Sequence, residues 1–168
     1  NLVNEFSDFA RMPKPILKDN NIVTLTKDNI NLLESLDDEI KISFNPLKRG
    51  IFFKSDSEQL SRVFFNLIKN SIESIQEKKQ VNSNHKGKID VELWEDDSYI
   101  DFVIRDNGLG FGIFTENIKD ILNPYFTTKK NGTGLGLSIV NKIINDHQGS
   151  LNFIDLDEGA EIQIKFKK

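Results

Sequence analysis

Two asparagines lie four residues apart in the run Asn66-Leu67-Ile68-Lys69-Asn70. On a helix, residues at this spacing occupy the same face one turn apart, so both carboxamides can face one ligand. Amide oxygens are hard, neutral donors that suit Mg²⁺, an ion that takes few protein ligands and keeps several waters. Two exposed asparagines on a helix are also ordinary, so the pair alone leaves both interpretations open.

A second candidate is Asp106, which opens the run Asp106-Asn107-Gly108-Leu109-Gly110-Phe111-Gly112. An aspartate at a strand end can accept a hydrogen bond from a ligand, and glycines beside it let that ligand approach the backbone closely. A tight turn with a capping aspartate explains the run equally well. The spacing of Gly108, Gly110 and Gly112 does not match the dinucleotide-binding fingerprint, and no acidic residue closes a βαβ unit.

The third motif is Asn123-Pro124-Tyr125-Phe126-Thr127-Thr128-Lys129-Lys130, which combines aromatic residues with two lysines. It has little periodicity, which is compatible with a mobile flap whose cations meet phosphate. A surface loop with one buried aromatic anchor is the alternative.

The fourth motif is Gly132-Thr133-Gly134-Leu135-Gly136-Leu137-Ser138, at the expected start of a helix. Free N–H groups and the positive end of the helix dipole make such a place a ready phosphate site. No Walker lysine follows these glycines, which excludes a P-loop nucleotide hydrolase.

A long helix is expected to carry the asparagine pair. Apolar residues recur near helical spacing from Leu60 to Ile75, and Ser55 or Asp56 is the expected N-cap. A shorter helix is expected around residues 30–36, with Thr26 or Asp28 as its cap. A third helix is predicted over about 134–147, with Gly149 as its C-terminal stop.

Alternating apolar residues predict the strands, most of which pair as hairpins. The expected strands are 40–44, 51–53, 89–93, 100–104, 151–153 and 162–166, with turns at 96–98 and at Glu158-Gly159. The fold class is therefore α/β, with a mixed, mostly antiparallel sheet covered on one face by helices.

The composition is that of a folded domain. The 168 residues carry a net charge of -4, with no clustered basic face, which argues against nucleic-acid binding. The absence of cysteine excludes disulfides and thiolate chemistry and suits a reducing cytoplasm. No apolar run approaches the length of a membrane span.

In order and spacing, the four motifs resemble the N, G1, F and G2 boxes of sensor histidine kinases, and the run GTGLGLSIV is specific to them. The opening EFSDFARMPKP is similar to the end of the dimerisation helix in NtrY-type nitrogen-regulation kinases. The resemblance implies a Bergerat-fold (GHKL) catalytic domain over residues 15–168 and the end of a dimerisation helix over residues 1–14.

The resemblance also implies roles for single residues. Asp106 would bind the adenine amino group of ATP, and Asn70 with Asn66 would hold Mg²⁺ against the phosphates. Gly108, Gly110 and Gly112 would border the nucleotide. Residues 109–133 would form a lid anchored by Phe126. The remaining contacts to the phosphates would come from Lys129 or Lys130 and from Gly132, Thr133, Gly134, Leu135 and Gly136.

In many relatives a basic residue and then an aromatic residue follow the second asparagine by one turn, but here Glu73 and Ser74 stand there. A basic contact to phosphate must then come from elsewhere, which leaves Lys69 and Lys129 as candidates.

The two histidines, His85 and His147, lack the sequence context of a phosphate acceptor. His85 is expected to be a solvated loop residue. His147 is expected to have a structural role, at a helix C-terminus that favours a cation.

The acceptor histidine is therefore expected on the dimerisation domain of the same protein, with a response regulator receiver domain as the next partner. The resemblance implies a homodimeric intact kinase anchored to the membrane, of which this chain is a monomeric cytoplasmic part. The alternatives are a GHKL-type ATPase, an anti-sigma-factor-like serine kinase and a domain that only senses nucleotide. An ATPase of this fold needs a glutamate base at the place of Asn66, and an amide cannot take a proton from water.

Overall fold

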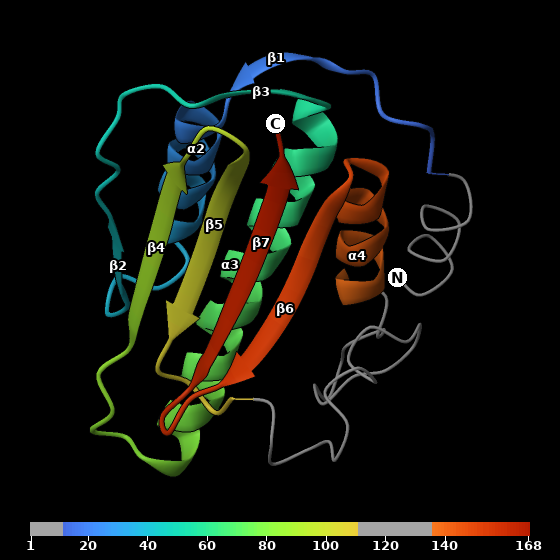
Figure 1. The fold of residues 1–168 in the computed structure, drawn as a ribbon. Helices are drawn as coiled ribbons and strands as arrows, with labels where there is room; N and C mark the ends of the chain where they lie inside the picture. The colour runs from blue at the N-terminus through green and yellow to red at the C-terminus, as the bar shows by residue number, and fades with distance from the viewer. Residues whose placement is uncertain (1–11, 111–135) are drawn as a thin grey trace.

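The computed structural model describes residues 12–110 and 136–168 as one α/β layered unit (Figure 1). Its order along the chain is β1 (Lys18–Asn21), α2 (Ile22–Glu34), β2 (Lys41–Phe44), β3 (Phe52–Ser55), α3 (Ser57–Val81), β4 (Lys88–Glu95), β5 (Tyr99–Asp106), α4 (Gly136–Asp146), β6 (Gly149–Asp155) and β7 (Ala160–Lys167).

The main sheet has the strand order β2-β4-β5-β7-β6. β2 and β4 are parallel, and the other neighbouring pairs are antiparallel. A separate two-stranded ribbon joins β1 to β3. The prediction of a mixed, mostly antiparallel sheet is confirmed.

Helices α2, α3 and α4 lie side by side behind the main sheet, with α3 in the middle (Figure 1). The apolar stripe predicted on α3 faces the sheet: Leu60, Phe64 and Leu67 are fully buried, and the Phe64 ring stacks on Phe102 of β5 with centroids 4.5 Å apart. Among the described residues, no helix combines the length and the apolarity that a membrane crossing requires.

The cap of α3 is Asp56, one of the two expected residues, and its side chain accepts from the Gln59 amide at 3.1 Å. The predicted turn at residues 96–98 is also confirmed, with the Asp96 carboxylate accepting from the Ser98 and Tyr99 amides at 2.8 Å each. Hydrogen bonds between a side chain and a backbone amide two or three residues away follow from the residue types, so both features were predictable from the sequence.

The start of α2 was predicted wrongly. The helix begins at Ile22, and its cap is Asn21, whose side chain accepts from the Val23 amide at 3.1 Å. Thr26 lies inside the helix, where its hydroxyl donates to the Ile22 carbonyl at 2.8 Å. The β-branched pair at 22–23 suggests a strand in isolation, but burial of both side chains against the core decides for the helix.

The C-terminal end of α4 was also predicted imprecisely. Gly149 begins β6, and the residue with a left-handed backbone is Gln148, at φ 58°. Gly149 is needed for a different reason, since a Cβ there would lie 2.9 Å from the side chains of both Ile144 and Phe166.

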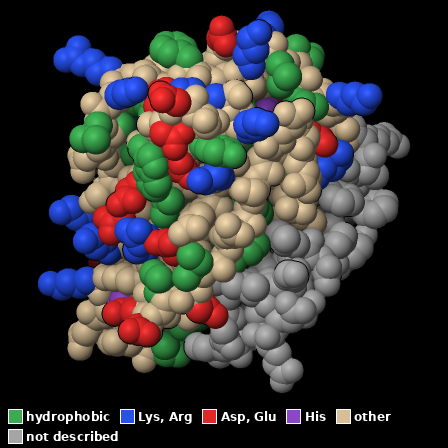
Figure 2. Space-filling model, in the orientation of Figure 1, with side chains coloured by type: hydrophobic (Ala, Val, Ile, Leu, Met, Phe, Trp, Pro, Cys, Tyr) green, Lys and Arg blue, Asp and Glu red, His purple; other side chains and the backbone are tan. Residues whose placement is uncertain are grey.

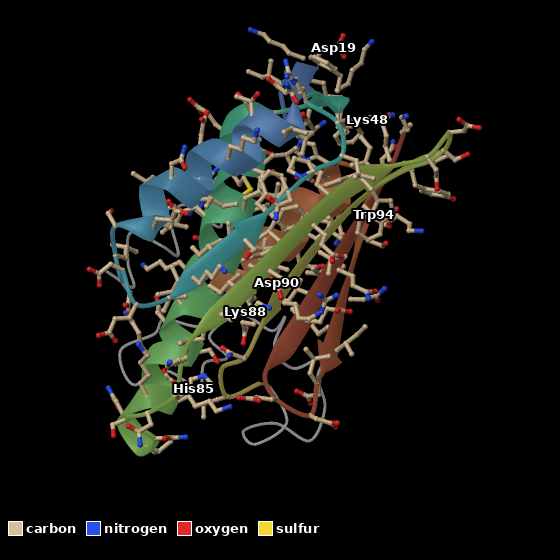
Figure 3. All side chains as sticks on the ribbon, turned by 90° about the vertical axis from the view of Figure 1, so that its left-hand side faces the viewer. Asp19, Lys48, His85, Lys88, Asp90 and Trp94 are labelled. Carbon is tan, nitrogen blue, oxygen red and sulfur yellow. The ribbon has the colours of Figure 1, made fainter. Side chains whose placement is uncertain are left out.

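The face of the sheet that the helices leave open carries several ion pairs, and Trp94 of β4 and Tyr99 of β5 are exposed as well. Arg105 of β5 bridges Glu161 of β7 at 2.7 Å and Glu92 of β4 at 3.8 Å. Figure 2 views this face and shows acidic and basic side chains interspersed on it. Figure 3 shows Lys88 and Asp90, an ion pair at 3.7 Å, following one another along β4.

The turn between β6 and β7 packs directly on the end of β5. Gly159 has a φ of +92°, and a Cβ there would lie 1.9 Å from the Asp106 carbonyl oxygen. We expect Gly159→Ala to lower the free energy of unfolding by about 1–3 kcal/mol, because alanine adds both a strained backbone and a clash. Urea unfolding measures the change. The control is Gly136→Ala, where a Cβ would meet no described residue within 4 Å. Equal stability of Gly159→Ala and the wild type would contradict this packing.

Candidate functional site

Asp106 is the last residue of β5 and is 8% exposed. Its Oδ1 accepts from the Gly108 amide at 2.8 Å, and the hydroxyl of Ser71 on α3 also hydrogen-bonds to the carboxylate. The end of β5 therefore places a buried carboxylate against the middle helix, α3. The glycine run begins directly after this strand.

Burial raises the pKa of Asp106, against the lowering effect of hydrogen bonds from Gly108, Ser71 and Ala160 and of the charge on Lys78. A carboxylate whose charge is poorly solvated gains more than an exposed one from a further hydrogen-bond donor. This environment is typical of a binding-site acid and suits a neutral donor such as an amino group.

The long helix brings the asparagine pair to the same region. Ser71, which contacts Asp106, is 3% exposed, and its neighbour Asn70 is half-buried. Asn66 lies one turn earlier on the helix and is half-buried as well. α3 therefore carries one amide adjacent in sequence to the serine that contacts the buried acid, and a second amide one turn before the first.

Two serines that no motif pointed to are part of this arrangement. Besides Ser71, Ser74 accepts a hydrogen bond from the Leu109 amide on its Oγ at 2.9 Å. A Cβ on Gly108 would lie 2.4 Å from the same oxygen, so this glycine allows the loop to pack on α3. The signal was a polar residue, Ser71, inside an apolar helical stripe.

Asn107 fastens the same loop to the start of β4. Its Nδ2 donates to the Lys86 carbonyl at 2.9 Å, and its Oδ1 accepts from the Lys88 amide at 2.9 Å. The residue between Asp106 and Gly108 therefore has an anchoring role, which the sequence did not reveal.

Of the two lysines left as candidates for phosphate contact, Lys69 is described. It projects from α3 with its side chain 49% exposed and lies 3.9 Å from Glu73 on the next turn. At that exposure the ion pair contributes little stability, so Lys69 can exchange Glu73 for another anion at small cost.

The rest of the predicted site lies largely outside the described residues. Gly108 and Gly110 are described, and Gly136 begins α4. Gly110 has a φ of +79°, which favours glycine there. The predicted residues outside the described part are Gly112, Phe126, Lys129, Lys130, Gly132, Thr133, Gly134 and Leu135.

The prediction that His85 is solvated is wrong. Its side chain is 7% exposed, and its Nδ1 lies 3.7 Å from Oε1 of Glu158, on the β6–β7 turn. Its Nε2 has no hydrogen-bond partner among the residues that the structure describes. The turn reaches this loop because Lys78 of α3 binds the same carboxylate at 2.8 Å, a contact across 80 residues of chain that no local pattern reveals.

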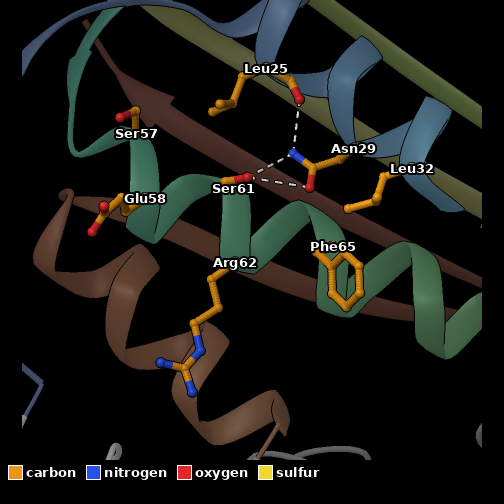
Figure 4. Close-up of a pocket in the computed structure, with 8 residues that line it drawn as sticks. All are labelled: Leu25, Asn29, Leu32, Ser57, Glu58, Ser61, Arg62 and Phe65. Atoms are coloured by element: carbon orange, nitrogen blue, oxygen red, sulfur yellow. Dashed lines mark hydrogen bonds between the residues drawn. The ribbon is translucent and has the colours of Figure 1, made fainter.

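A hollow of about 500 Å³ lies elsewhere, between α2 and α3 (Figure 4). Asn29 crosses it and pairs with Ser61 at 3.0 Å. None of the predicted site residues that the structure describes lines it. The described lining residues are Leu25, Asn29, Leu32, Ser57, Glu58, Ser61, Arg62 and Phe65.

The amide oxygens of Asn66 and Asn70 suit a hard cation such as Mg²⁺ that is also bound by a ligand. They are too few to hold a metal ion by themselves. The described residues contain no group of three or more His, Cys, Asp or Glu side chains that could hold a metal. The pair Asn66 and Asn70 offers amide oxygens, and Mg²⁺ accepts such a small protein share when phosphate oxygens and water complete its shell.

Comparison with known proteins gives the family. Residues 55–168 match the family described as histidine kinase-, DNA gyrase B- and HSP90-like ATPase. The chain is 37% identical over 167 residues to an NtrY-like sensor histidine kinase of Rickettsia prowazekii, covering 99% of this chain and 26% of that protein. It is 31% identical over 165 residues to the nitrogen regulation protein NtrY of Azorhizobium caulinodans, covering 98% of this chain and 21% of that protein.

Among solved structures, the nucleotide-free catalytic domain of the histidine kinase ThkA superposes with a TM-score of 0.78 at 25% identity, covering 91% of this chain and 96% of that one. The chain spans about a quarter of the length of the curated relatives it matches. The chain belongs to the histidine kinase-, DNA gyrase B- and HSP90-like ATPase family, and its sequence is similar to that of NtrY-type sensor histidine kinases.

Proposed function

We propose that this chain binds Mg-ATP and donates the γ-phosphoryl group to a histidine on the dimerisation domain of the same sensor kinase. The observation that carries the proposal is the buried Asp106 carboxylate, placed by Ser71 beside the helix that bears Asn66 and Asn70. Membership in the family and the similarity to NtrY-type kinases support the same function.

In the proposed mechanism, Asp106 accepts a hydrogen bond from the adenine amino group, and Ser71 and the Gly108 amide hold the carboxylate in place. Asn70 and Asn66 would hold Mg²⁺, which would neutralise phosphate charge during transfer. Gly136 and the glycines before it would offer backbone donors at the start of α4. No group of the protein needs to react covalently, because phosphoryl transfer depends mainly on positioning and electrostatics.

Hydrolysis of ATP is the rival reaction for this fold. The residue one turn before Asn70 is Asn66, whose amide cannot act as a general base toward water. We therefore favour transfer to a protein acceptor over rapid turnover of ATP.

The proposed partners follow from the relatives. One solved neighbour of the same fold is ThkA in complex with the response regulator TrrA, at a TM-score of 0.80 and 22% identity. We propose that the intact protein is a homodimer whose phosphohistidine serves a response regulator receiver domain. By the same similarity we propose that it is anchored to a membrane outside this chain.

Calorimetry with ATP and GTP tests the nucleotide part of the proposal. We expect binding of Mg-ATP, and binding of Mg-GTP at least about tenfold weaker, because guanine presents a carbonyl oxygen where adenine presents an amino group and Asp106 is an acceptor. Affinity for ATP should fall as the pH is lowered through the raised pKa of Asp106, since a protonated carboxyl can no longer accept on both oxygens. Equal affinity for the two nucleotides would remove Asp106 from the base-binding role.

A further inference from the structure

His147 closes the C-terminal end of α4 and is 5% exposed. Its Nδ1 lies 2.8 Å from the Ile143 carbonyl oxygen, so Nδ1 carries the proton and donates it. Its Nε2 accepts from the Asp56 backbone amide at 3.1 Å. The predicted structural role is therefore confirmed. The ring joins the end of α4 to the start of α3 through hydrogen bonds at both of its nitrogens.

Asp56 makes three connections from one residue. Its amide binds His147, its Oδ1 caps α3 by accepting from the Gln59 amide at 3.1 Å, and its Oδ2 accepts from the Ile16 amide at 2.9 Å. Although burial acts to raise it, hydrogen bonds from the Ile16, Gln59 and Glu58 amides hold the pKa of Asp56 below its ordinary value.

Ile16 belongs to residues 12–17, which lead into β1 and are called the entry segment here. Gln59 forms a second hydrogen bond to this segment. Its Nε2 donates to the Pro13 carbonyl at 2.9 Å, and the residue is 8% exposed. Met12 packs partly buried against the core. The entry segment is thus bonded at two points to the first turn of α3, and Asp56 also bonds to α4.

Both helices that meet at Asp56 carry the proposed nucleotide site. α3 bears Asn66 and Asn70, and α4 begins at Gly136. With 11 residues, α4 is about 16 Å long, so His147 and Gly136 lie at opposite ends of one short helix. A ligand that binds at the N-terminal end of α4 therefore acts, through the helix, on the position of His147 at its C-terminal end.

We propose that His147 is a positioning residue that couples nucleotide binding to the entry segment. The inference rests on the proposed function and goes beyond it, because it assigns a route between the nucleotide site and residues 12–17. By thermodynamic reciprocity, nucleotide tightens the entry segment, and a fixed entry segment tightens nucleotide binding.

The coupling can be tested by measuring the hydrogen-exchange rate of the Ile16 amide in the 168-residue chain, with and without Mg-ADP. We expect nucleotide to slow this exchange by about fivefold or more. The Tyr99 amide, which also donates to an aspartate carboxylate, at 2.8 Å in the β4–β5 turn, is the internal control and should not respond.

Two substitutions of His147, by glutamine and by asparagine, each keep a different one of its two hydrogen bonds. His147→Gln can place an oxygen at the position of Nε2 and keep the bond from Asp56. His147→Asn can place its nitrogen at the position of Nδ1 and keep only the bond to Ile143. We expect the Gln variant to retain the response at Ile16 and the Asn variant to lose it, with both still binding Mg-ADP. A merely structural role would damage both variants alike.

Asp56→Asn provides an independent test that leaves the fold intact, because asparagine caps helices as well as aspartate does. It keeps one acceptor oxygen for Gln59 and the backbone bond to His147, and loses the acceptor for Ile16. We expect Mg-ADP affinity to fall by about fivefold. The coupling alone would be overturned if the wild type bound nucleotide in calorimetry but the hydrogen exchange of Ile16 did not change. It would also be overturned if nucleotide changed this exchange equally in the two His147 variants. Absence of nucleotide binding by the wild type would overturn the proposed function and the coupling with it.

Discussion

Asp106→Asn is expected to weaken ATP binding by roughly 1–3 kcal/mol, or about 5- to 150-fold, the cost of an unsatisfied buried polar group. The Gly108 amide donates to Oδ1 at 2.8 Å, which selects the oxygen of an introduced carboxamide for that place. The NH₂ group then occupies the position of Oδ2, where it faces the adenine amino group donor to donor. Isothermal calorimetry measures the loss directly.

The same substitution should leave the protein folded, which separates lost binding from lost structure. Because burial raises the pKa of Asp106 above its ordinary value of 3.8, the folded state holds its proton more tightly than the unfolded chain. The folded protein therefore loses stability as the pH rises from 3.8 through the raised pKa. Asparagine carries no charge to bury and keeps an acceptor oxygen for the Gly108 amide, but it loses the second acceptor oxygen that serves the donors around Asp106. The two effects oppose one another, so urea unfolding at pH 7 should find the variant within about 1–2 kcal/mol of the wild type. Unchanged ATP affinity in this folded variant would exclude Asp106 as the adenine acceptor.

Asn70→Ala is expected to reduce phosphotransfer to an added histidine-bearing dimerisation segment by about 100-fold or more, since a bound metal contributes several kcal/mol of charge stabilisation. Binding of ADP without metal should change little, because the base contacts belong to Asp106. The matched control is Asn145→Ala, which removes an exposed asparagine of α4. The two measurements are transfer rates with labelled Mg-ATP and calorimetry with metal-free ADP. Full Mg²⁺-dependent transfer by Asn70→Ala would show that the metal assignment is wrong.

The parts of the fold that were predictable are those whose signals are local. Alternation of apolar residues located the strands of both hairpins, and the helical stripe located α3 with its cap at Asp56. Strand β1 was missed because its sequence, KDNN, has neither alternation nor strand propensity. It forms because the backbone pairs with β3, and Asn20 adds a bond to the Ser55 carbonyl at 2.8 Å.

The candidate site shows the same division. Asp106 and the asparagines were found from residue type and spacing, since a strand end and a helical turn are both readable in one dimension. The contacts of Ser74 with Leu109, of Asn107 with Lys88 and of His147 with Asp56 were not predicted, because these partners lie 19 or more residues apart in the sequence. Such long-range pairings are set by how the layers stack, and sequence pattern carries almost no information on that.

Labelled Mg-ATP, incubated with the chain alone and with the dimerisation segment of the same protein supplied in trans, tests the central claim most directly. The chain alone should acquire no label and release little free phosphate, because it has no acceptor histidine in a suitable context and Asn66 stands where a base would activate water. With the added segment, label should appear on that segment's histidine, as mass analysis can locate. Stoichiometric phosphate on the chain itself, at His85 or His147, would contradict the account.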